Sequence, residues 1–495
     1  MNNSFISTRI GQQDLSSPYG MLMTSLALVA PVFYLVIVWF YTANCPVSDD
    51  HIVSLFSILR FTHADNWHDK LSAITWTYMQ HRGIYGKIIY VIDYVITGKQ
   101  NFHMQAMLGN SSLCIVLFLL TRSIIRHQLP LYCIPLCSFL IFSFYAWTVT
   151  VWPGGSIWYF GTIMWALACF CAIDAEKPKI LVACFCSWLS AYTFANGILV
   201  IPVATLLLLY NQYFSRPEYV SGPTKRYTTA QMALWFVSAM VCCIVYVSTI
   251  NLFSTDLYGA KTLEQSFVNV PGRLLDFVES VGAVPFPTGD DRSGKILFGA
   301  IILAGTLAVL SSGKFMASPA ITAFWAFNLT TLFTTSLFRY SAGGNPGYQI
   351  FTSINLAMVL VMASGAWPPK PASRIPALLL ALSIAVNLQG IHLNLENIRQ
   401  NRQQSDSWLA HAVATRDFSP EEWKGGLVMD AIAAGIYAPD FLKDLPPAEM
   451  DISARTDLYK RTCNGLKKHF FVKAAGPLFD TYCKKSAQNN KIPSP

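Results

Sequence analysis

Two adjacent carboxylates, Asp49 and Asp50, follow directly after the first long apolar run of this 495-residue chain. A carboxylate at a bilayer surface is partly removed from water, which raises its pKa and suits it to act as a general base toward a hydroxyl group. The second carboxylate would orient the first or hold a divalent cation, which prefers oxygen ligands. A solvated helix end, with Ser48 or Asp49 as the N-cap of a helix from Ile52 to Arg60, fits the same residues. The pair is therefore our candidate catalytic site, and also our candidate metal site if a metal is used.

Basic side chains follow the acidic pair at His81, Arg82 and Lys87. Aromatic and polar residues alternate through this part of the chain, which predicts short helices lying in the membrane interface. Cations at that depth are placed to neutralise a phosphate leaving group as its charge develops. Snorkelling or binding of lipid headgroups would use the same residues.

A fourth candidate cation, Arg339, lies in the glycine-rich link 338–348. Backbone freed by glycine, beside an arginine, is able to cradle an anion. An ordinary tight turn explains the same pattern. We therefore expect His81, Arg82, Lys87 and Arg339 as a phosphate-binding set.

The amino-acid composition indicates the class of protein that positions these candidate residues. Only 13% of the residues are charged and 53% are hydrophobic, whereas a soluble domain has roughly 25% charged residues. Lipid must therefore solvate much of the exterior, which excludes soluble, disordered, collagen-like and coiled-coil classes. The formal net charge of +8 is dispersed between apolar runs, so we expect no nucleic-acid partner.

Apolar runs long enough to cross a bilayer predict an all-α polytopic membrane protein with about eleven transmembrane helices. The runs are about 21–43, 104–121, 130–151, 156–173, 180–195, 197–211, 231–251, 295–311, 319–337, 349–366 and 374–391. The pair 180–195 and 197–211 depends on a turn at Asn196-Gly197.

In an eleven-span arrangement the Lys and Arg of the short links, among them Arg122, Arg126, Lys177 and Lys179, fall on one side, and the short links of the other side carry only Arg339. The positive-inside rule then predicts a cytoplasmic N-terminus and a C-terminus on the opposite side. The long segments 44–103, 252–294 and 392–495 all fall on that opposite side. We expect a transmembrane region over 1–391, with interfacial helices in the first external loop, and a small, mostly helical external domain over 392–495.

The cysteines, the absence of several sequence motifs and the lack of charge inside the spans limit the functions that this chain could have. Cys463 and Cys483 have a spacing that would close a small disulfide loop in an oxidising compartment. The chain has no phosphate-binding glycine motif, no nucleophile elbow and no C-x-x-C. The predicted spans hold no charged residue in their interiors, which disfavours ion-coupled transporters and flippases.

The acidic pair after the first span, the two long external loops and the external C-terminal domain resemble the GT-C class of membrane glycosyltransferases. Within that class the chain is most similar to bacterial serotype-converting O-antigen glucosyltransferases, with Asp49-Asp50 and, more loosely, Gln80-His81-Arg82 and Arg339-Tyr340 as matching motifs. The resemblance implies a polyprenyl-phosphate-linked sugar as donor and a surface glycan as acceptor, in the bacterial inner membrane with the C-terminus periplasmic. It also implies that Asp49 or Asp50 is the catalytic base.

Two rival functions stay open. An O-antigen polymerase or ligase would depend on arginines of the external loops, such as Arg273 or Arg292, more than on the acidic pair. A flippase for lipid-linked glycans would need a polar or cationic route through the spans.

Overall fold

The computed structural model describes residues 15–77, 81–214, 227–248, 269–286, 291–313, 318–338, 346–368, 374–415 and 422–439. Within these ranges the chain forms helices and no β-strand. The fold class predicted from the sequence, an all-α polytopic membrane protein, is confirmed. Arg339, Cys463 and Cys483 lie outside the described residues.

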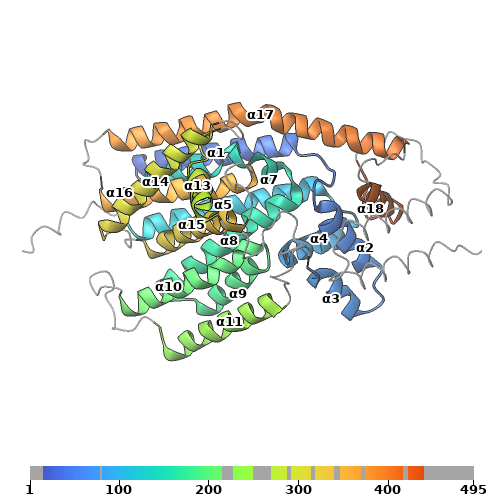
Figure 1. Ribbon diagram of the computed structural model, residues 1–495, viewed down its shortest axis with the longest axis horizontal. Helices are drawn as coiled ribbons and strands as arrows, with labels where there is room; N and C mark the ends of the chain where they lie inside the picture. Colours follow the sequence, from blue (N-terminus) through green and yellow to red (C-terminus); the bar gives the residue numbers. More distant parts are fainter. Residues whose placement is uncertain are drawn as a thin grey trace, which may run out of the picture.

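Ten helical segments in the described ranges are long and apolar enough to cross a membrane. They lie side by side in a bundle (Figure 1). Single helices form seven of them: α1 (Pro18–Tyr41), α5 (Phe102–Arg126), α8 (Pro153–Asp174), α11 (Thr229–Ser248), α14 (Arg292–Ser311), α15 (Pro319–Phe338) and α17 (Ile375–Thr415). Two or three consecutive helices form the rest: α6 (Cys133–Ile141) with η2 (Phe144–Ala146) and α7 (Trp147–Val151), η3 (Ala195–Leu199) with α10 (Val200–Tyr213), and η7 (Pro346–Tyr348) with α16 (Gln349–Ala366).

The eleventh predicted span is shorter than expected. The chain does break near the predicted position, but it turns at Tyr192–Phe194, and Asn196-Gly197 is part of η3. The first part is helical only as α9 (Ile180–Ala191), 12 residues long. That length corresponds to about 18 Å, well under the roughly 30 Å of a hydrocarbon core. The turn at Tyr192–Phe194 therefore lies beside α8 inside the bundle, where its aromatic rings contact the candidate site.

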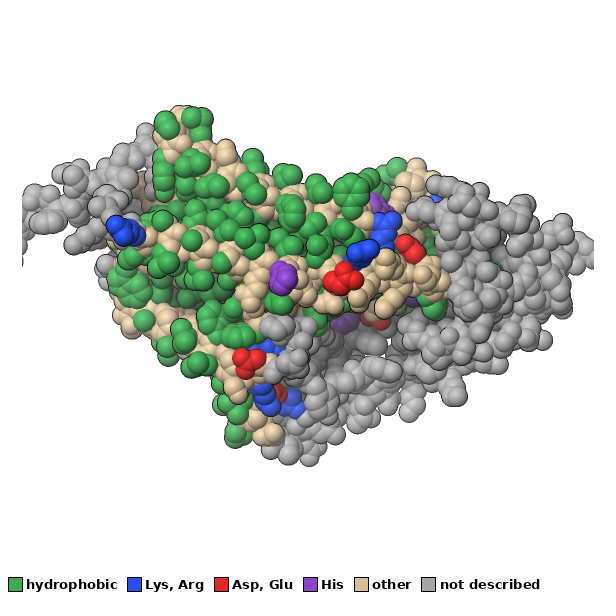
Figure 2. Space-filling view, turned by 90° about the horizontal axis from the view of Figure 1, so that it is seen from above, with side chains coloured by type: hydrophobic (Ala, Val, Ile, Leu, Met, Phe, Trp, Pro, Cys, Tyr) green, Lys and Arg blue, Asp and Glu red, His purple; other side chains and the backbone are tan. Residues whose placement is uncertain are grey.

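The membrane-facing surface is apolar. The helix α1 exposes large apolar side chains along its length, among them Leu28, Val32 and Phe40. Figure 2 shows apolar side chains covering one face of the bundle, while charged side chains gather along the extension of α17. An apolar surface over the bundle is expected for a protein in a bilayer, because exposing a charge to hydrocarbon is energetically costly.

One end of the bundle carries the short helices of the first loop, and we call it the Asp50 end. It includes η1 (His51–Phe56), α2 (Ser57–Thr62), α3 (Trp67–Thr75), α4 (Ile84–Thr97) and α18 (Glu422–Ala433). Figure 1 shows α2, α3, α4 and α18 together at one end of the bundle, below the extension of α17. At the opposite end His127 pairs with Asp174 at 2.8 Å. The predicted interfacial helices of loop 44–103 are thus present.

The predicted domain boundary at 391 does not interrupt the chain. The helix α17 continues through it as a single 41-residue helix. Figure 1 shows α17 along the top of the bundle, reaching past the end of α1 toward α18. The C-terminal segment is therefore joined to the bundle by a continuous helix.

Two spans have an interruption in their backbone hydrogen bonding. At each one, the carbonyls left without a helical partner accept hydrogen bonds from polar side chains of neighbouring helices. Pro31 in α1 has no N–H, and the carbonyl of Ala27 that it leaves free accepts a hydrogen bond of 2.6 Å from Ser138 of α6. Where α6 ends, the amide of Asn387 on α17 donates to the carbonyls of Phe139 and Phe142, at 2.7 and 2.9 Å. In a bilayer core such carbonyls have no water to bond with.

A buried polar triad joins α1, α5 and α7 just before the start of α8. The hydroxyl of Tyr34 donates to Asn110 at 2.6 Å and lies 3.0 Å from Thr150. Beside it, a Cβ on Gly109 of α5 would lie 2.1 Å from the hydroxyl oxygen of Ser156 on α8. Only glycine permits this close crossing, which sets where the N-terminus of α8 meets the loop after α1.

Candidate active site

Asp50 is buried where the loop after α1 meets the N-terminus of α8. Its side chain is 1% exposed, and its two carboxyl oxygens accept from separate donors. The backbone N–H of Val47 donates to Oδ2 at 3.1 Å, and that of Gly154 donates to Oδ1 at 2.9 Å. Two positions earlier, Ser48 has a positive φ of 53°, a strained conformation for serine that turns the loop inward.

The sequence Trp152-Pro153-Gly154 explains why a free N–H faces this carboxyl. The residue before proline favours extended backbone, and Trp152 has φ −92° and ψ 112°. Proline then occupies the first position of α8, where no N–H is needed. The N–H of Gly154 is one of the unpaired donors of the first helical turn, and Asp50 supplies its acceptor.

The surroundings of Asp50 act on its pKa in opposite directions. Burial raises the pKa of this carboxyl to about 8, and the hydrogen bonds from Val47 and Gly154, together with the nearby indole of Trp152, offset only part of that effect. Nearby Asp49 raises it further. A carboxyl with this pKa exchanges protons near neutral pH, which suits general acid–base chemistry.

Tyr90 and Trp158 bring two further polar groups beside Asp50. The Tyr90 hydroxyl and the Trp158 indole nitrogen are both buried and have no hydrogen-bond partner among the described residues. Burial and the nearby carboxyls of Asp50 and Asp49 hold the pKa of Tyr90 above its ordinary value, so its hydroxyl remains a donor. Leaving such groups unpaired costs about 1–3 kcal/mol each, which favours a site built for a polar ligand.

Two glycines keep this cluster open. A Cβ on Gly154 would lie 2.3 Å from Oδ1 of Asp50 and 3.0 Å from the Tyr90 hydroxyl. A Cβ on Gly86 of α4 would lie 2.7 Å from the Trp158 indole nitrogen and 3.5 Å from the same hydroxyl. Tyr90 thus connects the carboxyl of Asp50 with the indole of Trp158.

Aromatic rings continue from this cluster to His81. The His81 ring stacks on Phe194 at 4.2 Å between centroids, and it lies 6.0 Å from Trp158. The backbone N–H of Ala195 donates to its Nδ1 at 3.3 Å. His81 is therefore held at the turn between α9 and η3, on the same aromatic wall as Trp158.

Arg82 and Lys87 have structural partners. The guanidinium of Arg82 donates to the carbonyls of Val245 and Tyr246 at the end of α11, at 3.1 and 3.0 Å. Lys87 is fully buried, donates to the carbonyls of Trp76 and Arg82, and lies over the Trp76 ring. Burial, with Arg60 and Arg82 nearby, lowers its pKa well below the ordinary value. Both side chains hold the segment before α4 in place, a role that the sequence did not predict.

Asp49 and Asp50 do not form a metal-binding group. The side chain of Asp49 is partly exposed, and its backbone carbonyl starts η1 by accepting from Ile52 and Val53. The described residues contain no group of three or more His, Cys, Asp or Glu side chains arranged to hold a metal ion. Within the described residues no further His, Cys, Asp or Glu side chain therefore joins Asp49 and Asp50 as a third ligand.

Gln100 connects the site to the C-terminal segment. Its side chain accepts from Ser54 of η1 at 2.9 Å and donates to the carbonyl of Tyr90 at 2.7 Å, while its backbone N–H donates to Ile436. The hydroxyl of Tyr437 donates to the carbonyl of Asn44 in the loop before Asp50, at 2.6 Å. The segment after α18 is thus bonded to both sides of the candidate site.

The arginines that a polymerase or ligase would use are engaged in ion pairs. Arg273 of α13 (Val270–Val281) lies 3.2 Å from Asp276, and Arg292 of α14 lies 2.9 Å from Asp276 and 3.2 Å from Glu279. The pairs of Arg292 join α14 to α13, whereas the Arg273–Asp276 pair lies within α13.

Comparison with protein-family models, curated proteins and solved structures found no match to this chain.

Proposed function

We propose that this chain is a membrane glycosyltransferase that moves a sugar from a polyprenyl-phosphate donor to a hydroxyl group of a lipid-linked surface glycan. Glucose and O-antigen are the donor sugar and acceptor that the resemblance to serotype-converting enzymes favours. The observation that carries the proposal is the buried Asp50 carboxyl, with a pKa of about 8, beside the unpaired donors of Tyr90 and Trp158. The proposed reaction takes place on the periplasmic side of a bacterial inner membrane.

In this reaction the ionised Asp50 accepts the proton of the attacking hydroxyl. The hydroxyl oxygen bonds to the anomeric carbon while the bond from that carbon to the phosphate oxygen breaks, and the electron pair leaves with the polyprenyl phosphate. Tyr90 and Trp158 donate hydrogen bonds to sugar oxygens, and the rings of Trp158 and Phe194 pack against the apolar face of the sugar.

Among the predicted phosphate ligands, His81 is the one placed to meet the leaving group. It lies on the aromatic wall next to Trp158, whereas Arg82 and Lys87 donate to backbone carbonyls. Arg82 and Lys87 then act by holding the segment that presents His81. Arg339 remains a proposed ligand from the link after α15.

Single substitutions of the acidic pair test the proposal directly. We expect Asp50→Asn to reduce transfer from polyprenyl-phosphate glucose by about 10²–10⁴-fold, the usual contribution of a general base. Asp49→Asn should have a smaller effect, because Asp49 is only partly buried. The matched control is Asp69→Asn, an exposed carboxylate in the first turn of α3.

Full activity in both Asp49→Asn and Asp50→Asn would refute the assignment. Loss of activity with Arg273→Ala or Arg292→Ala, while the acidic pair is dispensable, would favour a polymerase or ligase. Movement of labelled lipid-linked sugar across proteoliposomes without any transfer would favour a flippase.

A further inference from the structure

A cavity lies at the Asp50 end, apart from the residues of the candidate active site. It has a volume of about 730 Å³ and lies between the end of α1, the start of α5 and the extension of α17. Cavities of roughly 300–1,000 Å³ are the size that small-molecule ligands occupy. None of Asp50, Tyr90, Trp158 and His81 lines this cavity.

The cavity lies where α17 changes from apolar to charged. From Ile375 the helix carries no Asp, Glu, Lys or Arg until Glu396, a distance of about 31 Å at the helical rise, which matches the hydrocarbon thickness of a bilayer. Arg402 and Asp406 follow within the next three turns and line the cavity. The cavity therefore lies at headgroup depth.

Its charged wall carries one cation and one anion. Arg402 and Asp406 lie one turn apart on α17, 3.6 Å from each other, and both side chains are about half exposed. The guanidinium of Arg402 also donates to the carbonyl of Phe40 at the end of α1. A ligand whose head carries both a positive and a negative group complements this wall.

His103 adds an acceptor to the cavity. Its Nδ1 lies 3.2 Å from the carbonyl of Thr42, and because a carbonyl only accepts, Nδ1 carries the proton. In the uncharged tautomer that keeps this Nδ1–H, Nε2 is an acceptor, and this buried nitrogen has no partner within the described ranges. The adjoining Thr42 hydroxyl, also buried, lacks one as well.

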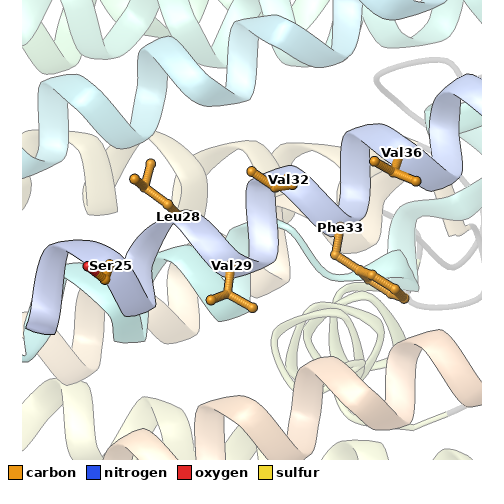
Figure 3. Close-up of a pocket in the computed structure, with 6 residues that line it drawn as sticks. All are labelled: Ser25, Leu28, Val29, Val32, Phe33 and Val36. Atoms are coloured by element: carbon orange, nitrogen blue, oxygen red, sulfur yellow. The ribbon is translucent and has the colours of Figure 1, made fainter.

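A shallow apolar groove, lined by α1 alone, lies along the same helix. Figure 3 shows its apolar lining, which is made by Leu28, Val29, Val32, Phe33 and Val36. At three- and four-residue spacing the same side continues to Trp39 and Phe40, which line the cavity. An apolar chain lying in the groove would therefore end in the charged cavity.

We propose that the cavity and the groove together bind one phospholipid with an ethanolamine headgroup. Arg402 binds the phosphate, while Asp406 and Nε2 of His103 accept hydrogen bonds from the primary ammonium. A choline headgroup has no N–H to donate, and a glycerol headgroup has no cation for Asp406. This inference does not depend on the proposed transferase activity.

The test measures lipid bound to the purified, delipidated full-length protein by native mass spectrometry, using dioleoyl phosphatidylethanolamine, phosphatidylcholine and phosphatidylglycerol. We expect one tightly bound phosphatidylethanolamine, with an affinity about tenfold above that of the other two lipids, which corresponds to one charge-assisted hydrogen bond. Arg402→Ala should weaken its binding by about tenfold, again the loss of one charged contact.

Three further variants separate the causes. Asp406→Asn should remove the preference over phosphatidylglycerol, and Ser407→Trp should block the cavity, because Ser407 is an exposed residue of its wall. Arg399→Ala, an exposed arginine of α17 that does not line the cavity, is the matched control and should bind normally. Equal binding of the three lipids, or unchanged binding in both Asp406→Asn and Ser407→Trp, would overturn the proposal.

Discussion

At the scale of single residues, Asp50 is surrounded by groups that favour opposite protonation states. Burial favours the neutral acid, whereas the N–H groups of Val47 and Gly154 and the indole of Trp152 favour the carboxylate. The sequence led us to expect a raised pKa from the membrane surface. In the structure the cause is burial against α4 and α8, which keeps the carboxyl close to the Tyr90 hydroxyl.

The pH dependence of transfer follows from this arrangement. A base must be ionised, so we expect kcat/KM to rise with pH through a midpoint of about 8. Trp152→Phe removes the nearby indole N–H that lowers the pKa of Asp50, so the midpoint should move to higher pH. The raised pKa of Asp50 has the opposite consequence for the free energy of unfolding. The stability that the protonated carboxyl contributes is fully present below pH 3.8 and is lost as pH rises through about 8. Measured pH–rate profiles of the two proteins check the first effect, and a midpoint near 4 would contradict it.

Gly154→Ala tests the cluster without removing any of its polar groups. The added Cβ would lie 2.3 Å from Oδ1 of Asp50, so the carboxyl or the helix must move. A displacement of about 1 Å in an active site costs on the order of 10²-fold in rate. The matched control is Gly305→Ala, where a Cβ meets nothing within 4 Å. Equal activity of the two variants would show that the cluster is not the reacting centre.

At the scale of helices, the broken span 133–151 depends on distant residues. Sequence hydropathy predicted the span because its apolar run is continuous. Asn-Gly favours a turn, so we expected the next break at Asn196-Gly197, whereas the chain turns earlier, at Tyr192–Phe194, and Asn196-Gly197 lies in η3. Hydropathy did not predict the break at Phe142, since the carbonyls freed there are bonded by Asn387, more than 240 positions later in the chain. For the same reason the roles of Tyr90 and Trp158 were missed, because only the packing of α4 on α8 brings them to Asp50. The sequence Pro-Gly-Gly at the start of α8 was the signal that could have indicated a partner for Asp50 there.

Asn387→Leu should destabilise the protein by about 1–3 kcal/mol, the cost of leaving buried carbonyls unpaired. The control, Asn397→Leu, changes an amide on the same helix that bonds only weakly to Leu393, at 3.5 Å. Thermal unfolding of both variants in the same detergent measures the difference. A shift no larger than that of the control would show that the break does not need Asn387.

At the scale of the whole molecule, the sidedness of the bundle is the main prediction. The positive-inside rule places the His127 end in the cytoplasm and the Asp50 end outside. We expect alkaline phosphatase to be active when fused after Pro439 and inactive when fused after Glu176 or Leu129, which lie in links at the His127 end. The reverse pattern would place the candidate site in the cytoplasm, where the proposed donor chemistry would not apply.

The continuous helix α17 has a consequence for how such a protein can be rebuilt by recombination. A crossover at 391 falls inside a rigid helix, and the segment beyond it returns to the first loop through Tyr437 and Gln100. A foreign C-terminal part would therefore have to match the loop around Asp50 as well as the helix it is spliced to. Chimeras joined at 391 should lose function even when both parents are active. We therefore expect the regions 1–391 and 392–495, which look separable in the sequence, to be exchanged successfully only together.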